Sequence, residues 1–203
     1  MSSQALTDAF GSWRQISLED VERRAPLLDR QETKYVLPAG TLDPMLATMD
    51  EDFDVLSIEG RTTFTYETVY FDTTDLTAYY HHAQGRRRRV KVRSRCYVDS
   101  GLCFFEVKTK GRRNSTVKER IPYDRSRHGS MDADAQAFLQ ECVDRAYGGA
   151  LRLPSEPSLL MRFQRTTLVG RGRRSGSRST RTCSSSGLTG RWWRPPGPRS
   201  SSR

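Results

Sequence analysis

Basic residues recur at every second position along one short stretch of the chain: Arg87, Arg89, Lys91, Arg93 and Arg95. In a β-strand, residues two apart project from the same face, so this spacing would align all five cations. The other register is apolar near its centre: Val90, Val92 and Cys96. Such a strand would pack one face against an apolar layer and present a row of positive charge on the other. Taken alone, the run is more typical of a solvated surface.

The same pattern recurs in three other segments, which favours a functional interpretation over a solvated surface. Residues 102–110 follow a turn signal at Asp99-Ser100-Gly101, so the two charged segments form a predicted hairpin. Charged residues also share one face in each of these segments: Glu106, Lys108 and Lys110; Lys118 and Arg120 in 115–122; and Arg30, Glu32 and Lys34 in 30–37. Four like-charged faces would repel one another on an open sheet. We therefore expect them to line a closed barrel that holds a polyanion, with carboxylates for a metal.

Five motifs that contain these residues occur in one order: Arg30-x-Glu32-x-Lys34-Tyr35, Tyr70-Phe71-Asp72-Thr73, Lys91-x-Arg93-x-Arg95-x-Tyr97, Glu106-x-Lys108 and Lys118-x-Arg120. Together, over residues 16–169, they resemble the VTC (vacuolar transporter chaperone) domain of polyphosphate polymerases. That domain belongs with the CYTH domains to the triphosphate tunnel metalloenzymes. The resemblance implies an α+β fold, in which an antiparallel eight-stranded β-barrel forms a triphosphate tunnel and helices pack outside it.

The resemblance also implies roles for individual residues. Those expected to be catalytic are Lys34, Arg93, Arg95 and Lys108, and those expected to bind substrate are Arg30, Arg89, Lys91, Lys118, Arg120 and Arg165. Glu32 and Glu106 are the expected ligands of Mn²⁺ or Mg²⁺, because carboxylates suit these cations. The alternative for both carboxylates is a salt bridge to a neighbouring Lys or Arg of the tunnel. One departure stands out, since the family's Tyr-x-Arg reads Phe163-Gln164-Arg165 here and loses a hydroxyl.

Three functions are compatible with a basic tunnel. The first is metal-dependent phosphoryl transfer that extends polyphosphate from ATP, and the second is hydrolysis of triphosphate, as in CYTH enzymes. The third is non-catalytic binding of a polyanion. Arg-x-Glu-x-Lys-Tyr and Tyr-Phe-Asp-Thr favour the VTC branch, because CYTH hydrolases typically read Glu-x-Glu-x-Lys in the first strand. The expected partners are ATP and polyphosphate, with a membrane protein as a possible further partner, and the oligomeric state is left open.

The net charge of +10 would suggest a nucleic-acid partner, but its distribution argues against one. Nine arginines and no acidic residue follow Gly170, so +10 − 9 leaves +1 for residues 1–170. The excess charge therefore belongs to residues 170–203, and no nucleic acid is expected as a partner. The Ser, Arg, Gly and Pro content of this segment is typical of a low-complexity tail.

The same composition also arises when a GC-rich gene is read out of frame. Permitted codons for residues 174–186, read two bases in, encode Glu-Arg-Leu-Thr-Val-Asp-Ala-Asp-Leu-Leu-Phe-Val, an ordinary strand similar to the family's Arg-x-Thr-x-Asp strand. We therefore expect a frameshifted C-terminus, a barrel that lacks its last strands and a weakly active or inactive product. A natural low-complexity tail is the alternative.

The remaining sequence predicts the elements that position these residues. Helices are expected at 18–28, 41–49, 74–85 and 132–147, and further strands at 53–58, 63–71 and 159–169. Residues 1–15 are expected to be disordered, and 16–169 to form one tunnel domain. Without a secretory signal or a long apolar run, the chain is expected in the cytoplasm. Its cysteines lack paired metal-site spacing and are expected to be buried, reduced thiols.

Overall fold

The structure is a computed structural model that describes residues 10–24, 35–111, 115–149, 151–171 and 189–192. The chain divides into two compact units. The first contains Met1–Phe64 and Gln164–Gly187, and the second contains Thr65–Phe163 and Leu188–Arg203. Each unit has an apolar cluster of its own.

The first unit contains a small sheet and its covering helices. Its elements are β1 (Gln15–Ile16), α2 (Leu18–Arg24), η1 (Ala39–Thr41), α3 (Leu42–Met49), β2 (Phe53–Leu56) and β8 (Leu168–Gly170). The strand order is β1-β2-β8, with β1 parallel and β8 antiparallel to β2. The apolar cluster combines Phe10, Trp13, Leu46, Phe53, Val55 and Leu168. Asp54 is buried beside it and is neutralised by Arg24 and Arg171, at 2.8 and 2.7 Å.

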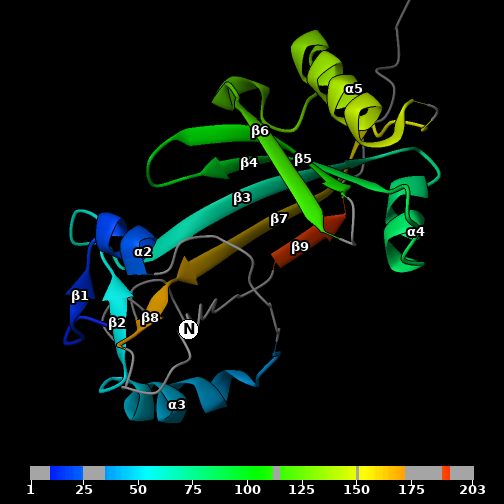
Figure 1. Cartoon of the computed structure of the whole chain (residues 1–203). Helices are drawn as coiled ribbons and strands as arrows, with labels where there is room; N and C mark the ends of the chain where they lie inside the picture. Colours follow the sequence, from blue (N-terminus) through cyan, green and yellow to red (C-terminus); the bar gives the residue numbers. More distant parts are fainter. Residues whose placement is uncertain (1–9, 25–34, 112–114, 150, 172–188, 193–203) are drawn as a thin grey trace, which may run out of the picture. The chain divides into compact units, whose positions relative to one another are not determined.

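The second unit is built on a larger sheet with the order β6-β5-β4-β3-β7-β9 (Figure 1). These strands are β3 (Thr63–Asp72), β4 (Val90–Tyr97), β5 (Leu102–Lys110), β6 (Thr116–Pro122), β7 (Glu156–Thr166) and β9 (Thr189–Trp192). Two strands extend into the first unit: β3 with its first residues, Thr63 and Phe64, and β7 with its last residues, 164–166. The helices are α4 (Thr77–Ala83), η3 (Arg125–Arg127) and α5 (Ala133–Tyr147).

The expected α+β class with antiparallel strands is confirmed. In the six-stranded sheet, β3 pairs antiparallel with β4, β4 with β5, β5 with β6, and β7 with β9. Among the strands that the structure describes, β6 and β9 stand at the two ends of the order, and no pairing between them closes the sheet. No helix in the described parts of the chain is long and apolar enough to cross a bilayer.

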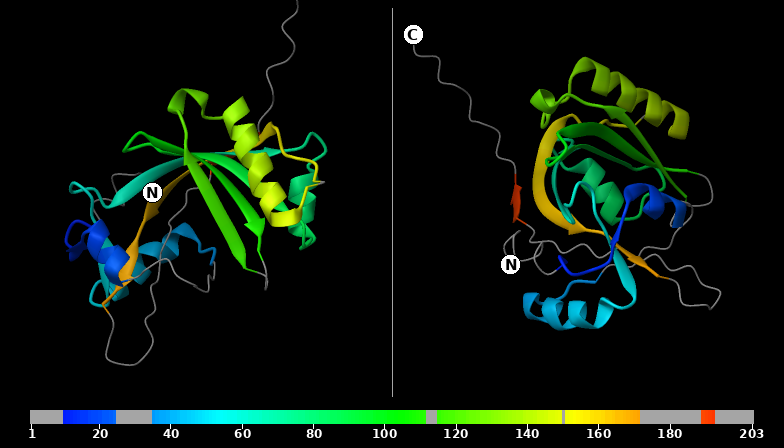
Figure 2. Two further views of the ribbon diagram at one scale, coloured as in Figure 1. Left: turned by 45° about the horizontal axis from the view of Figure 1, so that its top comes forward. Right: turned by 90° about the vertical axis from the view of Figure 1, so that its left-hand side faces the viewer.

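One face of the large sheet is covered by α5 (Figure 2). The apolar register of the strands supplies Val69, Phe71, Val90, Val92, Phe105 and Val107, and α5 supplies Ala135, Leu139, Cys142, Val143 and Tyr147. Asp132 caps the helix, since its side chain accepts a hydrogen bond from the Ala135 N–H. Gly148 ends it at φ 70°, a backbone conformation that glycine adopts without strain. The predicted helix and its apolar stripe are thus confirmed.

Apart from the strand predicted at 30–37, the other predicted elements agree with the structure to within a few residues. The charged hairpin is β4 and β5, and the third charged segment is β6. The single strand predicted over 159–169 is divided into β7 and β8, and the helix predicted over 74–85 is shorter, from Thr77 to Ala83. The predicted strand at 30–37 lies mostly outside the described residues, and its described part, from Tyr35 on, has no strand structure.

The cysteine prediction is correct for Cys142 and wrong for two others. Cys142 is free and buried, and burial, followed by the charge of Glu119, raises the pKa of its thiol to about 12. Cys96 and Cys103 form a disulfide across β4 and β5. They are directly opposite one another in the hairpin, with Cα atoms 4.1 Å apart. Spacing along the chain could not show this, because the pairing follows from the register of two strands.

Two expectations for the ends of the chain fall largely outside the described residues. Residues 1–9, most of the segment expected to be disordered, are not described, nor are 172–188 and 193–203. Between them, Thr189–Trp192 form β9, which pairs with Leu159–Arg162 of β7. The low-complexity composition does not predict this strand, and the frameshift stays a prediction.

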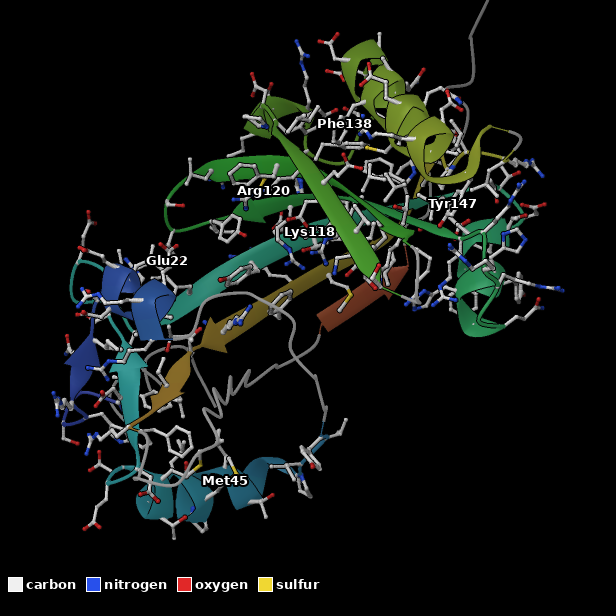
Figure 3. All side chains as sticks on the ribbon, in the orientation of Figure 1. Glu22, Met45, Lys118, Arg120, Phe138 and Tyr147 are labelled. Atoms are coloured by element: carbon white, nitrogen blue, oxygen red, sulfur yellow. A yellow bond between two sulfur atoms is a disulfide. The ribbon has the colours of Figure 1, made fainter. Side chains whose placement is uncertain are left out.

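Tyr147, the last residue of α5, forms hydrogen bonds to the backbone at the start of β4 and the end of β5 (Figure 3). Removal of its hydroxyl therefore tests the fold. Its hydroxyl donates to the Arg89 carbonyl at 2.6 Å and accepts from the Lys110 N–H at 2.7 Å. Tyr147→Phe should therefore lower the free energy of unfolding by about 1–3 kcal/mol, because both backbone groups lose their partner. Chemical denaturation measures this. Tyr80→Phe, at a side chain that is 51% exposed, should have little effect, and equal losses in the two variants would contradict the assignment.

Candidate anion-binding site

The side of the large sheet opposite α5 carries the predicted basic residues. We call it the charged face, and it comprises Lys91, Arg93, Arg95, Glu106, Lys108, Lys118 and Arg120. Strand register arranges it in rows across the sheet. The Lys108 row is Lys91, Lys108 and Lys118; the Glu106 row is Tyr70, Arg93, Glu106 and Arg120; the Arg95 row is Thr68, Arg95 and Phe104; and the Tyr97 row is Tyr66, Tyr97 and Leu102.

Glu106 is the charged centre of this face. Its side chain is 0% exposed, and its two oxygens bind different cations. Arg93 Nε donates a hydrogen bond to Oε2 at 2.5 Å, Arg93 Nη2 lies 2.5 Å from the same oxygen, and Lys118 Nζ lies 2.5 Å from Oε1. Burial alone would raise the pKa of this carboxyl, but the charges and hydrogen bonds of Arg93 and Lys118 outweigh burial and hold it below the ordinary 4.5. Glu106 is therefore an anion under neutral conditions and keeps two cations in place.

Tyr70 extends the Glu106 row onto β3. Its hydroxyl accepts a hydrogen bond from Arg93 at 3.3 Å, and Lys91 Nζ lies 4.6 Å from the centre of its ring. Burial would raise the pKa of the phenol, but the charges of Lys91 and Arg93 dominate and lower it below 10.0. Tyr70 belongs to the Tyr-Phe-Asp-Thr motif but is not among the predicted site residues. The available signal was alternation along β3, which places Tyr66, Thr68 and Tyr70 on one face.

Positive charge on this face exceeds negative charge. The seven residues that define the charged face are six cations and one carboxylate, so 6 − 1 leaves an excess of five positive charges among them. Among the described residues, no carboxylate forms an ion pair with Lys91, Arg95 or Lys108. Burial, and then the charges of Arg93, Lys118 and Lys91, lower the pKa of Lys108 below 10.5. Charges that repel one another in this way favour binding of a polyanion.

Aromatic rings gather at the other end of the face. Tyr66 stacks on Phe163 with ring centres 5.1 Å apart and lies 5.0 Å from Tyr97. Tyr97 meets the Phe104 ring edge-on at 6.0 Å. Guanidinium groups accompany these rings, because Arg95 lies 5.7 Å from the Tyr66 and Phe163 centres and Arg120 lies 4.4 Å from that of Phe104.

The Tyr-Phe-Asp-Thr motif holds the end of β3 to α4. Asp72 is buried, and its carboxylate accepts hydrogen bonds from the N–H groups of Thr73, Ala78 and Tyr79 at 2.7–2.9 Å. Phe71, on the opposite face, packs in the cluster beneath α5. These hydrogen bonds show that Asp72 orients the chain between β3 and β4.

Two other predicted site residues, Arg89 and Arg165, do not belong to these rows. Arg89 precedes β4, and its guanidinium donates to the Arg86 carbonyl at 2.8 Å. Arg165 lies in β7 within the first unit, where its Nε is buried without a hydrogen-bond partner among the described residues. Arg30, Glu32 and Lys34 lie outside the described residues.

The described residues do not form a metal site by themselves. Nowhere in the described parts of the chain do three His, Cys, Asp or Glu side chains gather as potential ligands. On the charged face the available carboxylate is Glu106, and each of its oxygens already contacts a cation. Glu106 could contribute one ligand to a cation held mainly by substrate oxygens, an arrangement typical of Mg²⁺.

The crowding of Lys108 by other cations generates a second prediction. Lys108→Met should raise the free energy of unfolding by about 1 kcal/mol without anions, because like-charge repulsion is relieved. It should also weaken binding of inorganic triphosphate, with loss of about 1.5–3 kcal/mol for a charge-assisted contact. Denaturation and titration calorimetry measure the two effects, and Arg125→Met in η3, an exposed position, is the control.

The pH dependence of stability follows from the same residue. Folded Lys108 loses its proton at lower pH than the unfolded lysine, so the unfolded state binds more protons between the lowered pKa and 10.5. Wild-type stability should therefore gain from Lys108 as pH rises through that interval, and Lys108→Met should lack this gain. Identical pH profiles would contradict the placement of Lys108 among the cations.

Comparison with known proteins agrees with this geometry. A family model described as the VTC domain matches residues 29–180. No curated protein matches the chain. The matched segment includes all five motifs and every strand of the charged face. Since it covers well over half of the sequence, the chain belongs to the VTC domain family.

Proposed function

We propose that this domain binds triphosphate and polyphosphate along the charged face and transfers phosphoryl groups from ATP to a growing chain. Membership in the VTC family supports a role in polyphosphate metabolism. The observation that carries the proposal is the excess of five positive charges on one ordered sheet face. Polyphosphate carries about one negative charge per phosphate unit. Cations repeated along the strands of one face can therefore neutralise successive phosphate units. In the proposed enzyme this face lines a closed tunnel.

The residues of the charged face would bind phosphate in two different ways. Arg93 is held by Glu106 and Tyr70, so its guanidinium is oriented before any ligand arrives. Arg95, fixed by a 3.1 Å hydrogen bond to Thr68, offers a second planar donor group. Lys91 and Lys108 supply point charges, with no carboxylate among the described residues to neutralise them. Phosphoryl transfer depends mainly on such positioning and charge neutralisation.

A divalent cation forms part of the proposal. Mn²⁺ or Mg²⁺ would neutralise the charge of the phosphate oxygens. Among the described residues, Glu106 is the carboxylate that would bind this metal. Glu106 would then exchange one of its present cation partners for the metal. Glu32, the other expected ligand, lies outside the described residues.

A polymerase and a triphosphate hydrolase would use the same cations and differ in what attacks the phosphorus atom. In polymerisation the terminal oxygen of a phosphate chain attacks, and in hydrolysis water attacks. Incubation with ATP and Mn²⁺ separates the two, because chain growth appears as long polyphosphate on a gel and hydrolysis appears as free phosphate. Binding with neither product would favour the non-catalytic polyanion-binding module.

A third prediction tests the phosphate-binding face. Lys91→Ala should weaken binding of inorganic triphosphate by about ten- to a hundredfold, the value of one charge-assisted contact. Titration calorimetry at low salt measures the affinity. Arg145→Ala removes an equal charge from α5, where Arg145 pairs with Glu119 on the opposite side of the sheet. Equal loss in both variants would mean that binding depends only on net charge, contrary to the proposal.

A fourth prediction tests the metal. Mn²⁺ should tighten triphosphate binding by the wild-type protein, and Glu106→Gln should remove this gain, which is the ratio of the affinities with and without Mn²⁺ in the same variant. Glu119→Gln on the other face of β6 is the matched control. Calorimetry with and without Mn²⁺ measures the effect, so no turnover is needed. If Glu106→Gln retains the gain from Mn²⁺, Glu106 serves only as the partner of Arg93 and Lys118.

A further inference from the structure

The charged face is chemically uneven from one end to the other. The Lys108 row contains three lysines, whereas the Glu106 and Arg95 rows each have a net charge of +1. The Tyr97 row contains no ionised side chain and consists of two tyrosines and a leucine. From the Lys108 row to the Tyr97 row, the net charge falls from +3 to +1, +1 and then 0, while the Tyr97 row contains the most aromatic residues.

The rings at the uncharged end do not belong to the apolar core. Tyr66, Tyr97, Phe104 and Phe163 are partly exposed and lie outside the cluster packed beneath α5. They share the face of the cations, with guanidinium groups among them. Partly exposed rings flanked by arginines are the usual platform for a nucleobase, which stacks on aromatic faces and on guanidinium planes.

We infer that the Tyr97 and Arg95 rows form a subsite for the base of a nucleoside triphosphate. This inference rests on the proposed function and adds the direction of the substrate to it. The base stacks on Phe104 beneath the Arg120 guanidinium, whose exposed side chain can move aside to admit it (Figure 3). The triphosphate then points towards the Lys108 row.

The spacing of the rows suits this orientation. Neighbouring rows lie about 7 Å apart, the length of two residues in a strand. Phe104 is thus one row from Arg93 and Glu106, and two rows from Lys108. A ribose links the base to the first phosphate at Arg95 and Arg93, and the terminal phosphate reaches the three lysines, where charge is highest. The reverse orientation would place the most highly charged group against rings.

The test compares ATP with inorganic triphosphate, which lacks the base. Calorimetric affinities for both ligands are measured in the wild type, Phe104→Ala, Phe104→Trp and Tyr79→Ala. Tyr79, a 57% exposed aromatic residue of α4, is the matched control. Phe104→Ala should lose about tenfold in affinity for ATP, the value of a modest base stack. Its affinity for triphosphate should not change, and Phe104→Trp should retain both.

The possible results separate the two proposals. A selective loss for ATP in Phe104→Ala supports the base subsite, and unchanged triphosphate binding in the same variant shows that its fold is intact. Equal effects on the two ligands, or none, would overturn the subsite and leave the proposed function standing. If the wild type binds neither ligand, the proposed function fails, and the subsite fails with it.

Discussion

Glu106 sits at the centre of a face whose other charges repel one another, and the arrangement of that face depends on it. Its two oxygens bind Arg93 and Lys118, from the strands on either side of β5. A buried charge is tolerated only when it is paired, and the buried Glu106 and Arg93 meet that condition through each other, with the more exposed Lys118 as a second partner of Glu106. The pairing joins β4, β5 and β6 at one point, and no carboxylate in the described part of the chain forms an ion pair with Lys91, Arg95 or Lys108.

The amphipathic sheet makes such a concentration of charge compatible with folding. One register of β3, β4 and β5 packs against α5 and buries a continuous apolar layer. The other register is thereby free to carry charge. Because side chains alternate strictly along a strand, a shift of one residue would bury the cations and expose the core. Strong burial on the α5 side therefore fixes the position of every cation on the other side.

Stability and binding oppose each other along this face. Lys91, Arg95 and Lys108 are held together by backbone pairing despite their mutual repulsion, which is the condition for a site ready to receive a polyanion. Burial first, and then the charges of its neighbours, lower the pKa of Lys108. Tyr70 reduces the repulsion between the cations, because its hydroxyl contacts Arg93 and its ring contacts Lys91 without adding charge. A bound phosphate chain would supply the negative charge that the described residues lack.

The sequence by itself determined the charged strands, the α5 stripe and the family, because these follow from local periodicity and from motifs within single segments. Alternation at every second residue needs only the geometry of one strand, and the capped helix at Ala133–Tyr147 needs only its own spacing. Only the tertiary structure decided which residues face one another across strands. The pairing of Glu106 with Lys118, the Cys96–Cys103 disulfide and the rings around Phe104 all depend on register. Register is set by turns and by burial summed over the whole sheet, and no single segment contains that information.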